Sequence, residues 1–254
     1  MIPTGGPFSN FGRNFSQLAS SPMTWLWMLL IVGIEALVMA MGGPDQQPTW
    51  SWYEWLGLSR EGILSGKIWQ MVSYGFLHGN EWHTGVNALF LLLVGSRIEH
   101  MAGAATMAKA TVFGVFGGAI GHLVLAPGGE NAPLLVGMSG GCMGLLLVLT
   151  TLSPQSRMMP LPVSGRSLGL GVLIAELILA LADPALHVPG LINLGNWLVS
   201  HGMGHWFQMG HACHFGGGVA GWLFGRWLLR PRVTLERLRR DRERREARET
   251  AQID

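Results

Sequence analysis

The last apolar stretch of the chain, GHACHFGGGVAGWLFGRWLL at residues 210–229, places small residues on one side of a helix. His214 is followed by Gly217, Gly221 and Gly225, and this spacing puts all four on one helical face. Because glycine has no side chain, such a stripe lets a second helix approach until the two backbones touch. The stretch predicts a helix that packs closely on another helix and carries a histidine into the contact.

The composition of the whole chain places this helix in a membrane. Hydrophobic residues make up 49% of the 254 residues and charged residues only 13%. Several apolar runs reach or approach the roughly 18 residues that span a bilayer. We therefore expect an all-α, polytopic membrane protein with six transmembrane helices. The predicted spans are 22–43, 81–98, 104–126, 137–152, 168–182 and 210–229.

Three regions follow from this reading. Residues 1–21 are polar and rich in Gly and Ser, which predicts a flexible cytoplasmic leader. Residues 22–230 form the six-helix membrane domain, in which the Trp-rich connection 44–70 is expected to rest at the headgroup level. Residues 231–254 form a charged cytoplasmic tail. Its mixed charges make nucleic acid an unexpected partner, whereas Arg226, Arg230 and Arg232 favour contact with anionic lipid headgroups.

The distribution of basic residues predicts the orientation. The termini and the two connections on their side of the membrane hold 15 of the 17 Lys and Arg residues. The other side keeps only Arg60 and Lys67. Since cytoplasmic connections carry an excess of Lys and Arg, both termini are expected in the cytoplasm, for a protein of the bacterial inner (plasma) membrane.

A serine stands at the start of the shortest predicted span. Ser139 opens a helix of about 14 residues, roughly 21 Å long, whereas the hydrocarbon core is about 30 Å thick. The helix must therefore begin below the outer surface, where irregular backbone is tolerated beside a water-filled cavity or inside protein. Ser139 is either a reactive group in a wet pocket or a simple helix cap.

Two further polar groups are expected near the outer surface. His214 is an ionisable residue inside a span, which is a functional hypothesis by default. His83 and Asn87 are four residues apart and share a helical face, so both side chains can donate hydrogen bonds toward one point. The alternative for each is polar contact between helices.

Taken together, these segments resemble the rhomboid family of intramembrane serine proteases. FLHGNEWHTGVNALFLLLVGSRIE at residues 76–99, GMSGG at 137–141 and CHFGGGVAG at 213–221 look like three motifs of that family, in the same order. The likeness covers a core of about residues 66–225. Met143 stands where the family usually has an aromatic residue, and Cys213 replaces the usual alanine.

The resemblance implies an endopeptidase that cleaves transmembrane segments of other membrane proteins. Ser139 is then the nucleophile and His214 its base, as a dyad without a third acid. The Ser139 N–H, His83 and Asn87 stabilise the oxyanion. No cofactor and no metal is implied, and Glu35, Glu99 and Glu176 are interpreted as structural. The sequence does not identify the substrate or the oligomeric state.

Two other functions stay open. One is a catalytically silent protein with the same fold that binds transmembrane clients, although such relatives commonly lack the serine or the histidine. The other is a membrane protein that binds a metal or haem through the histidines of residues 201–214, because His201 and His205 form an i,i+4 pair. The outer histidines are His187, His201, His205, His211 and His214.

Overall fold

The computed structural model describes residues 18–129, 134–158, 162–231 and 235–250 of the chain. This part is helical, and its β-pairing consists of two isolated bridges, Leu58 with Leu135 and Arg157 with Ser164. Most of the predicted leader lies outside the described residues, as do Glu130 and residues 159–161. The tail forms helix α13 (Leu235–Thr250).

All six predicted helices are present. The second is longer than expected, because α6 continues through one π-helical segment, Leu91–Gly95, into α7 (Ser96–Ala102). The other five follow the predicted bounds closely. They are α2 (Pro22–Ala40), α8 (Ala104–Leu125), α9 (Ser139–Leu152), α10 (Gly165–Leu181) and α12 (His211–Leu228), and α6 itself spans Glu81–Phe90.

Only part of the bundle is long enough to cross a bilayer by length and hydropathy alone. In the described residues α2 and α8 meet that test, while α9 is a shorter apolar helix. At 14 residues, α9 begins at Ser139 as the sequence predicts. Its Ser139 end therefore lies about 9 Å inside a hydrocarbon core about 30 Å thick if Leu152 lies at the opposite surface.

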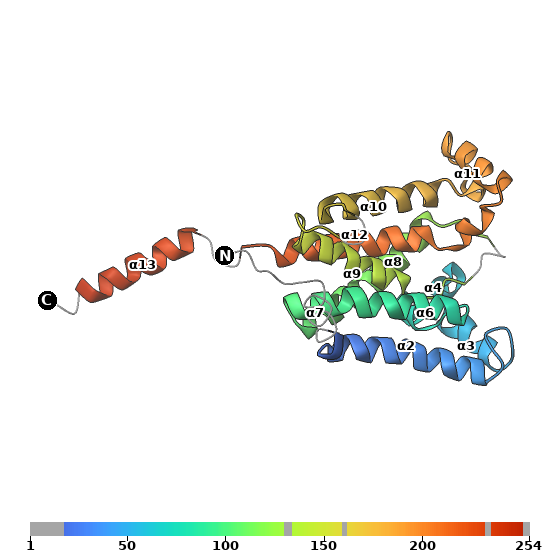
Figure 1. Cartoon of the computed structure of the whole chain (residues 1–254), viewed down its shortest axis with the longest axis horizontal. Coiled ribbons are helices and arrows are strands. Elements are labelled where there is room, and N and C mark those ends of the chain that lie inside the picture. The colour runs from blue at the N-terminus through green and yellow to red at the C-terminus, as the bar shows by residue number, and fades with distance from the viewer. Residues whose placement is uncertain (1–17, 130–133, 159–161, 232–234, 251–254) are drawn as a thin grey trace.

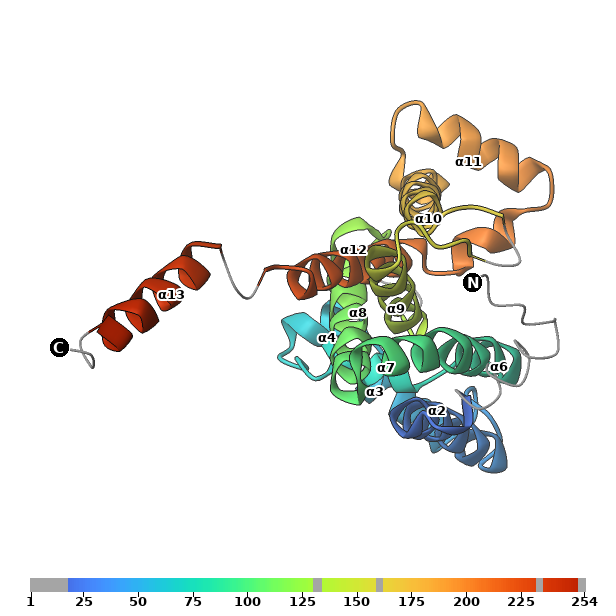
Figure 2. The same ribbon diagram turned by 60° about the vertical axis from the view of Figure 1, so that its left-hand side comes forward.

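Helix α12 lies inside the bundle. It packs on α8 and α9 on one side and on α10 on the other, while α2 packs against α6 at the opposite edge (Figures 1 and 2). Three apolar side chains of α10 face outward, namely Leu170, Ile174 and Ile178. The bundle thus has a close-packed centre of α8, α9 and α12, with α10 as an outer helix beside α12.

Glycines make the contacts of this centre. A Cβ atom built on Gly217 would lie 2.2 Å from the carbonyl oxygen of Gly140, and one built on Gly221 would lie 2.1 Å from that of Gly144. On the side toward α8, a Cβ on Gly216 would lie 2.3 Å from the Gly117 carbonyl oxygen. The predicted backbone contact is confirmed for Gly217 and Gly221, whereas Gly225 meets the side chain of Thr151. Gly216 adds a contact to a second partner helix, α8.

A carboxylate holds the start of α2. Pro22, at the first turn, has no N–H, and the next two backbone N–H groups, of Met23 and Thr24, donate to Glu99 Oε1 and Oε2 at 3.0 and 2.8 Å. The Thr24 hydroxyl donates to the same Oε2 at 2.8 Å. A negative group at a helix N-terminus is favourable. Glu99 has a structural role here, as interpreted from the sequence.

The connection between α2 and α6 is folded onto the bundle. It forms α3 (Thr49–Leu56), α4 (Arg60–Leu64), α5 (Gln70–Ser73) and η1 (Tyr74–Phe76). Trp55 and Trp69 lie with ring centroids 4.6 Å apart. The connection after α10 also forms η3 (Pro184–Leu186), α11 (Leu191–Ser200) and η4 (Gly204–Gln208), three elements absent from the predicted set.

We predict that Gly221→Ala destabilises the bundle, because its new methyl group collides with backbone rather than with a movable side chain. Overpacking of this kind costs about 1–3 kcal/mol, and intrinsic tryptophan fluorescence in detergent should show a lower Tm. Gly171→Ala on α10 is the matched control, since nothing lies within 4 Å of its Cβ. Equal Tm values for both variants would contradict the assigned backbone contact.

Candidate functional site

Ser139 is the first residue of α9 and is half-buried. The chain turns into the helix at Gly137, which has a φ of +118°, a value that residues other than glycine rarely adopt. Two contacts fix this turn: the Gly137 N–H donates to the Tyr74 carbonyl at 3.0 Å, and the Met138 N–H donates to His78 Nε2 at 3.3 Å. Burial, and to a smaller extent His83, lower the pKa of His78 to about 3, so its ring stays neutral and accepts this bond.

Helix α6 supplies the second side of the site. Asn80 caps it, with the His83 N–H donating to its Oδ1 at 2.9 Å. The His83 ring then lies directly against the turn, since a Cβ on Gly137 would be 2.5 Å from its Cε1 atom. A side chain at position 137 is therefore excluded twice, by the backbone conformation and by this imidazole.

Asn87 lies one turn further along α6 and is buried. Its Oδ1 accepts a contact from the Cys142 thiol of α9 at 3.7 Å. Its Nδ2 is buried and has no hydrogen-bond partner among the described residues. A buried donor without a partner is costly. The Nδ2 group of Asn87 is therefore free to donate to an acceptor that binds beside α9.

Helix α12 supplies the third side. It begins after Gly210, which is left-handed at a φ of +67°, and carries His214 in its first turn. Cys213 is fully buried, and a Cβ on Gly140 would lie 2.9 Å from its Sγ. The residues beside Ser139 and His214 thus touch each other, and His83 and His214 are close enough to interact electrostatically.

The structure therefore gathers Ser139, His83, Asn87 and His214 around the start of α9. Within the described part of the chain, no hydrogen bond joins the Ser139 hydroxyl to His214. The first three residues come from α9 and α6, and the fourth from α12. A buried helix start lined by two imidazoles, an amide and a hydroxyl has the groups needed for acyl transfer.

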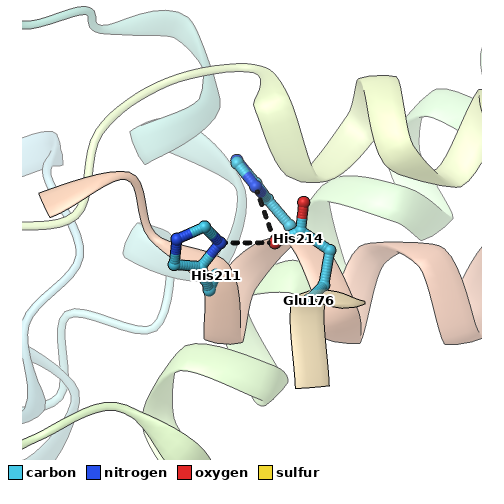
Figure 3. A group of neighbouring side chains, drawn as sticks. All are labelled: Glu176, His211 and His214. Atoms are coloured by element: carbon cyan, nitrogen blue, oxygen red, sulfur yellow. Dashed lines mark hydrogen bonds and ion pairs between the residues drawn. The ribbon is translucent and has the colours of Figure 1, made fainter. Parts of the chain in front are cut away.

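A carboxylate that was expected to be structural lies in this site. Glu176 of α10 places Oε2 at 2.6 Å from His211 Nδ1 and at 3.3 Å from His214 Nδ1 (Figure 3). With neutral rings, both Nδ1 atoms donate to this one oxygen, and the lone pair of each ring is left on Nε2. An acidic residue in a span was the available signal, but the spacing along the chain could not connect it with α12.

The other three histidines of the predicted outer group lie away from Glu176. His201 is exposed and packs on Trp197 with ring centroids 4.4 Å apart, and His205 is exposed in η4. His187 contacts the carbonyl of its neighbour Ala185. Of the histidines between residues 201 and 214, only His211 and His214 share a site, and their partner Glu176 lies outside that segment.

Comparison with known proteins adds two findings. The Rhomboid domain family model matches residues 65–231 of this chain. The human Rhomboid-related protein 3 is 34% identical over 83 residues. That similarity covers 33% of this chain and 20% of the human protein, so the chain matches about a fifth of this relative's length.

Proposed function

This chain belongs to the rhomboid family of integral membrane proteins, and on that premise we propose that it is an intramembrane serine endopeptidase. Ser139 is the nucleophile and His214 the general base. The observation that supports this proposal best is the contact of Gly140 with Gly217 and Cys213. It holds the helix starts that carry Ser139 and His214 at backbone distance.

The reaction needs only groups of the chain and water. His214 Nε2 takes the proton of the Ser139 hydroxyl as the oxygen attacks the scissile carbonyl, and then gives that proton to the leaving amine. Water, activated by the same imidazole, hydrolyses the acyl-enzyme. This step requires a water molecule to reach the start of α9, where irregular backbone within the membrane is tolerated beside a water-filled cavity.

The negative oxygen of the tetrahedral intermediate needs donors that already point at it. The Ser139 N–H at the start of α9, the His83 ring and the unpartnered Asn87 Nδ2 are these donors. Each such donor typically contributes 10²–10³ to turnover, about 3–4 kcal/mol. The buried position strengthens the effect because little water competes for the oxyanion.

Glu176 acts as a positioning residue in this mechanism. By accepting from His214 Nδ1, it favours the tautomer in which Nε2 is free to accept a proton. It also stabilises the imidazolium that forms during the attack. The predicted dyad thereby acquires an acidic partner from α10.

We place the substrate cleavage site in a transmembrane segment of another membrane protein, within the lipid bilayer. The chain itself is placed in the bacterial inner (plasma) membrane with both termini in the cytoplasm. The excess of basic residues near the termini supports this orientation. Nucleic acid has no role in this proposal.

A catalytically silent protein that binds transmembrane clients is the second candidate. The absence of a hydrogen bond between Ser139 and His214 in the described part of the chain favours it. Labelling of Ser139 by a fluorophosphonate probe distinguishes the two, since only an activated serine reacts. Catalytic hydrogen bonds commonly tighten when substrate binds, so a labelled Ser139 supports the protease.

We predict that Ser139→Ala and His214→Ala each abolish cleavage of a transmembrane substrate. The double variant should be no worse than either single one, because nucleophile and base act as a unit. His211→Ala should retain cleavage, since Glu176 then serves His214 alone. If His211→Ala lost activity and His214→Ala kept it, His211 and not His214 would be the general base.

We predict that Asn87→Ala lowers kcat by up to about 10²–10³ and changes KM little, because an oxyanion donor acts mainly in the transition state. Kinetics with a purified substrate in detergent or liposomes measure both constants. Leu89→Ala is the control on the same helix, since the Leu89 side chain is exposed on α6 and has no place at the oxyanion. An unchanged kcat in Asn87→Ala removes this residue from the site.

We predict that a reporter fused after Asp254 is cytoplasmic, because exporting the arginines of the tail would oppose the charge bias. A green fluorescent fusion should fluoresce, and an alkaline phosphatase fusion should be inactive. A phosphatase fusion in the connection between α8 and α9 is the positive control. Active phosphatase at the C-terminus contradicts the orientation.

A further inference from the structure

We propose that Glu176, His211 and His214 form a binding site for a divalent transition metal ion, best fitted to Zn²⁺, and that the bound ion switches the protease off. The second half of this proposal rests on the proposed role of His214 as general base. The first half rests on geometry alone. The site differs from the histidine cluster predicted from the sequence, because His201 and His205 take no part.

Three ligand atoms converge on one point. Glu176 Oε2 and the Nδ1 atoms of His211 and His214 all lie within 4.8 Å of one another. Tetrahedral zinc with bonds of about 2.0–2.1 Å separates its ligand atoms by roughly 3.3 Å. The two O–N separations in the structure are 2.6 and 3.3 Å. The third separation, between the two Nδ1 atoms, is at most 4.8 Å. Shifts of up to about 1.5 Å therefore admit the ion, which replaces the protons between the carboxylate and the rings.

The ligands of this site come from two helices that pack on each other, α12 and α10. His211 and His214 lie three residues apart on α12, whose glycines lock it to α8 and α9. Glu176 comes from α10, which packs on α12. The buried Nε2 of His211 has no hydrogen-bond partner in the described part of the chain, so Glu176 Oε2, at 2.6 Å from Nδ1, is the one hydrogen-bond partner of this ring there.

The chemistry of the ligands selects the metal. Two imidazoles and one carboxylate suit zinc, which accepts nitrogen and oxygen ligands in four-coordinate sites. Calcium and magnesium prefer oxygen ligands and larger coordination numbers. The fourth position of the ion is left for water. A single carboxylate leaves the site with one net positive charge when the ion binds, so moderate affinity is expected.

Binding has a direct consequence for His214. The ion occupies the lone pair at Nδ1, so the one proton of the neutral ring must sit on Nε2. Nε2 then donates and cannot accept the proton of Ser139. The metal thus holds the base in the wrong tautomer, whereas Glu176 alone holds it in the right one. No metal is needed for cleavage.

The binding experiment uses the full chain carrying Ser139→Ala, which cannot cleave itself or a substrate. After chelator treatment, Zn²⁺ is titrated by calorimetry, and bound metal is counted after dialysis. Co²⁺ replaces zinc for an absorption spectrum of the ligand field. We expect one site per chain. Adding His211→Ala should weaken it at least about tenfold, as even loss of a supporting group costs 10–100-fold.

Controls address folding and other histidines. His205→Ala removes an exposed histidine outside the site and should leave the affinity unchanged. His211→Asn keeps a polar side chain facing Glu176, so it tests the ligand if His211→Ala fails to fold. The Tm of each variant without metal shows that it is folded. Equal zinc affinity in the folded variants with and without His211 overturns the site.

The activity experiment separates the two halves of the proposal. Zinc should inhibit the wild type, EDTA should restore its activity, and His211→Ala should need at least about tenfold more zinc for the same inhibition. If zinc binds with the expected variant pattern but the wild type cleaves no substrate, the proposed protease fails and the metal site stands. If the wild type cleaves equally with the site filled and empty, the switch is wrong.

Discussion

The contact of glycine backbones between α8, α9 and α12 is the constraint on which the rest of the structure depends. Where Gly217 and Gly221 meet the carbonyls of Gly140 and Gly144, no side chain separates the helices. This distance fixes the depth of Ser139 relative to His214. It also leaves α10 outside, where it can reach the first turn of α12 with one long acidic side chain.

Much of the fold could be predicted because its causes are local. Apolar runs indicated the six helices, the glycine spacing indicated the packing face of α12, and the length of α9 indicated a helix start inside the membrane. The π-helical segment 91–95 and helix α11 could not be predicted in this way. Both depend on how neighbouring elements pack, for which the sequence has no periodic signal.

The residues of the site also differ in how far the sequence could predict them. The motifs indicated Ser139, His83, Asn87 and His214, and the structure brings these residues around one helix start. The link of Glu176 to His211 and His214 joins positions 35 and 38 residues apart on two helices. Such a contact depends on the rotation and tilt of α10, so the sequence left Glu176 as one more polar residue in a span.

Helix α10 has 17 residues, about 26 Å at 1.5 Å per residue, and its outward face is apolar. It is thus shorter than a typical hydrocarbon core of about 30 Å, and a helix of that length is sensitive to hydrophobic mismatch. A thicker or thinner bilayer acts first on such a peripheral helix. Because α10 carries the carboxylate that orients His214, lipid chain length becomes a variable of the proposed chemistry, with no ligand or modification involved.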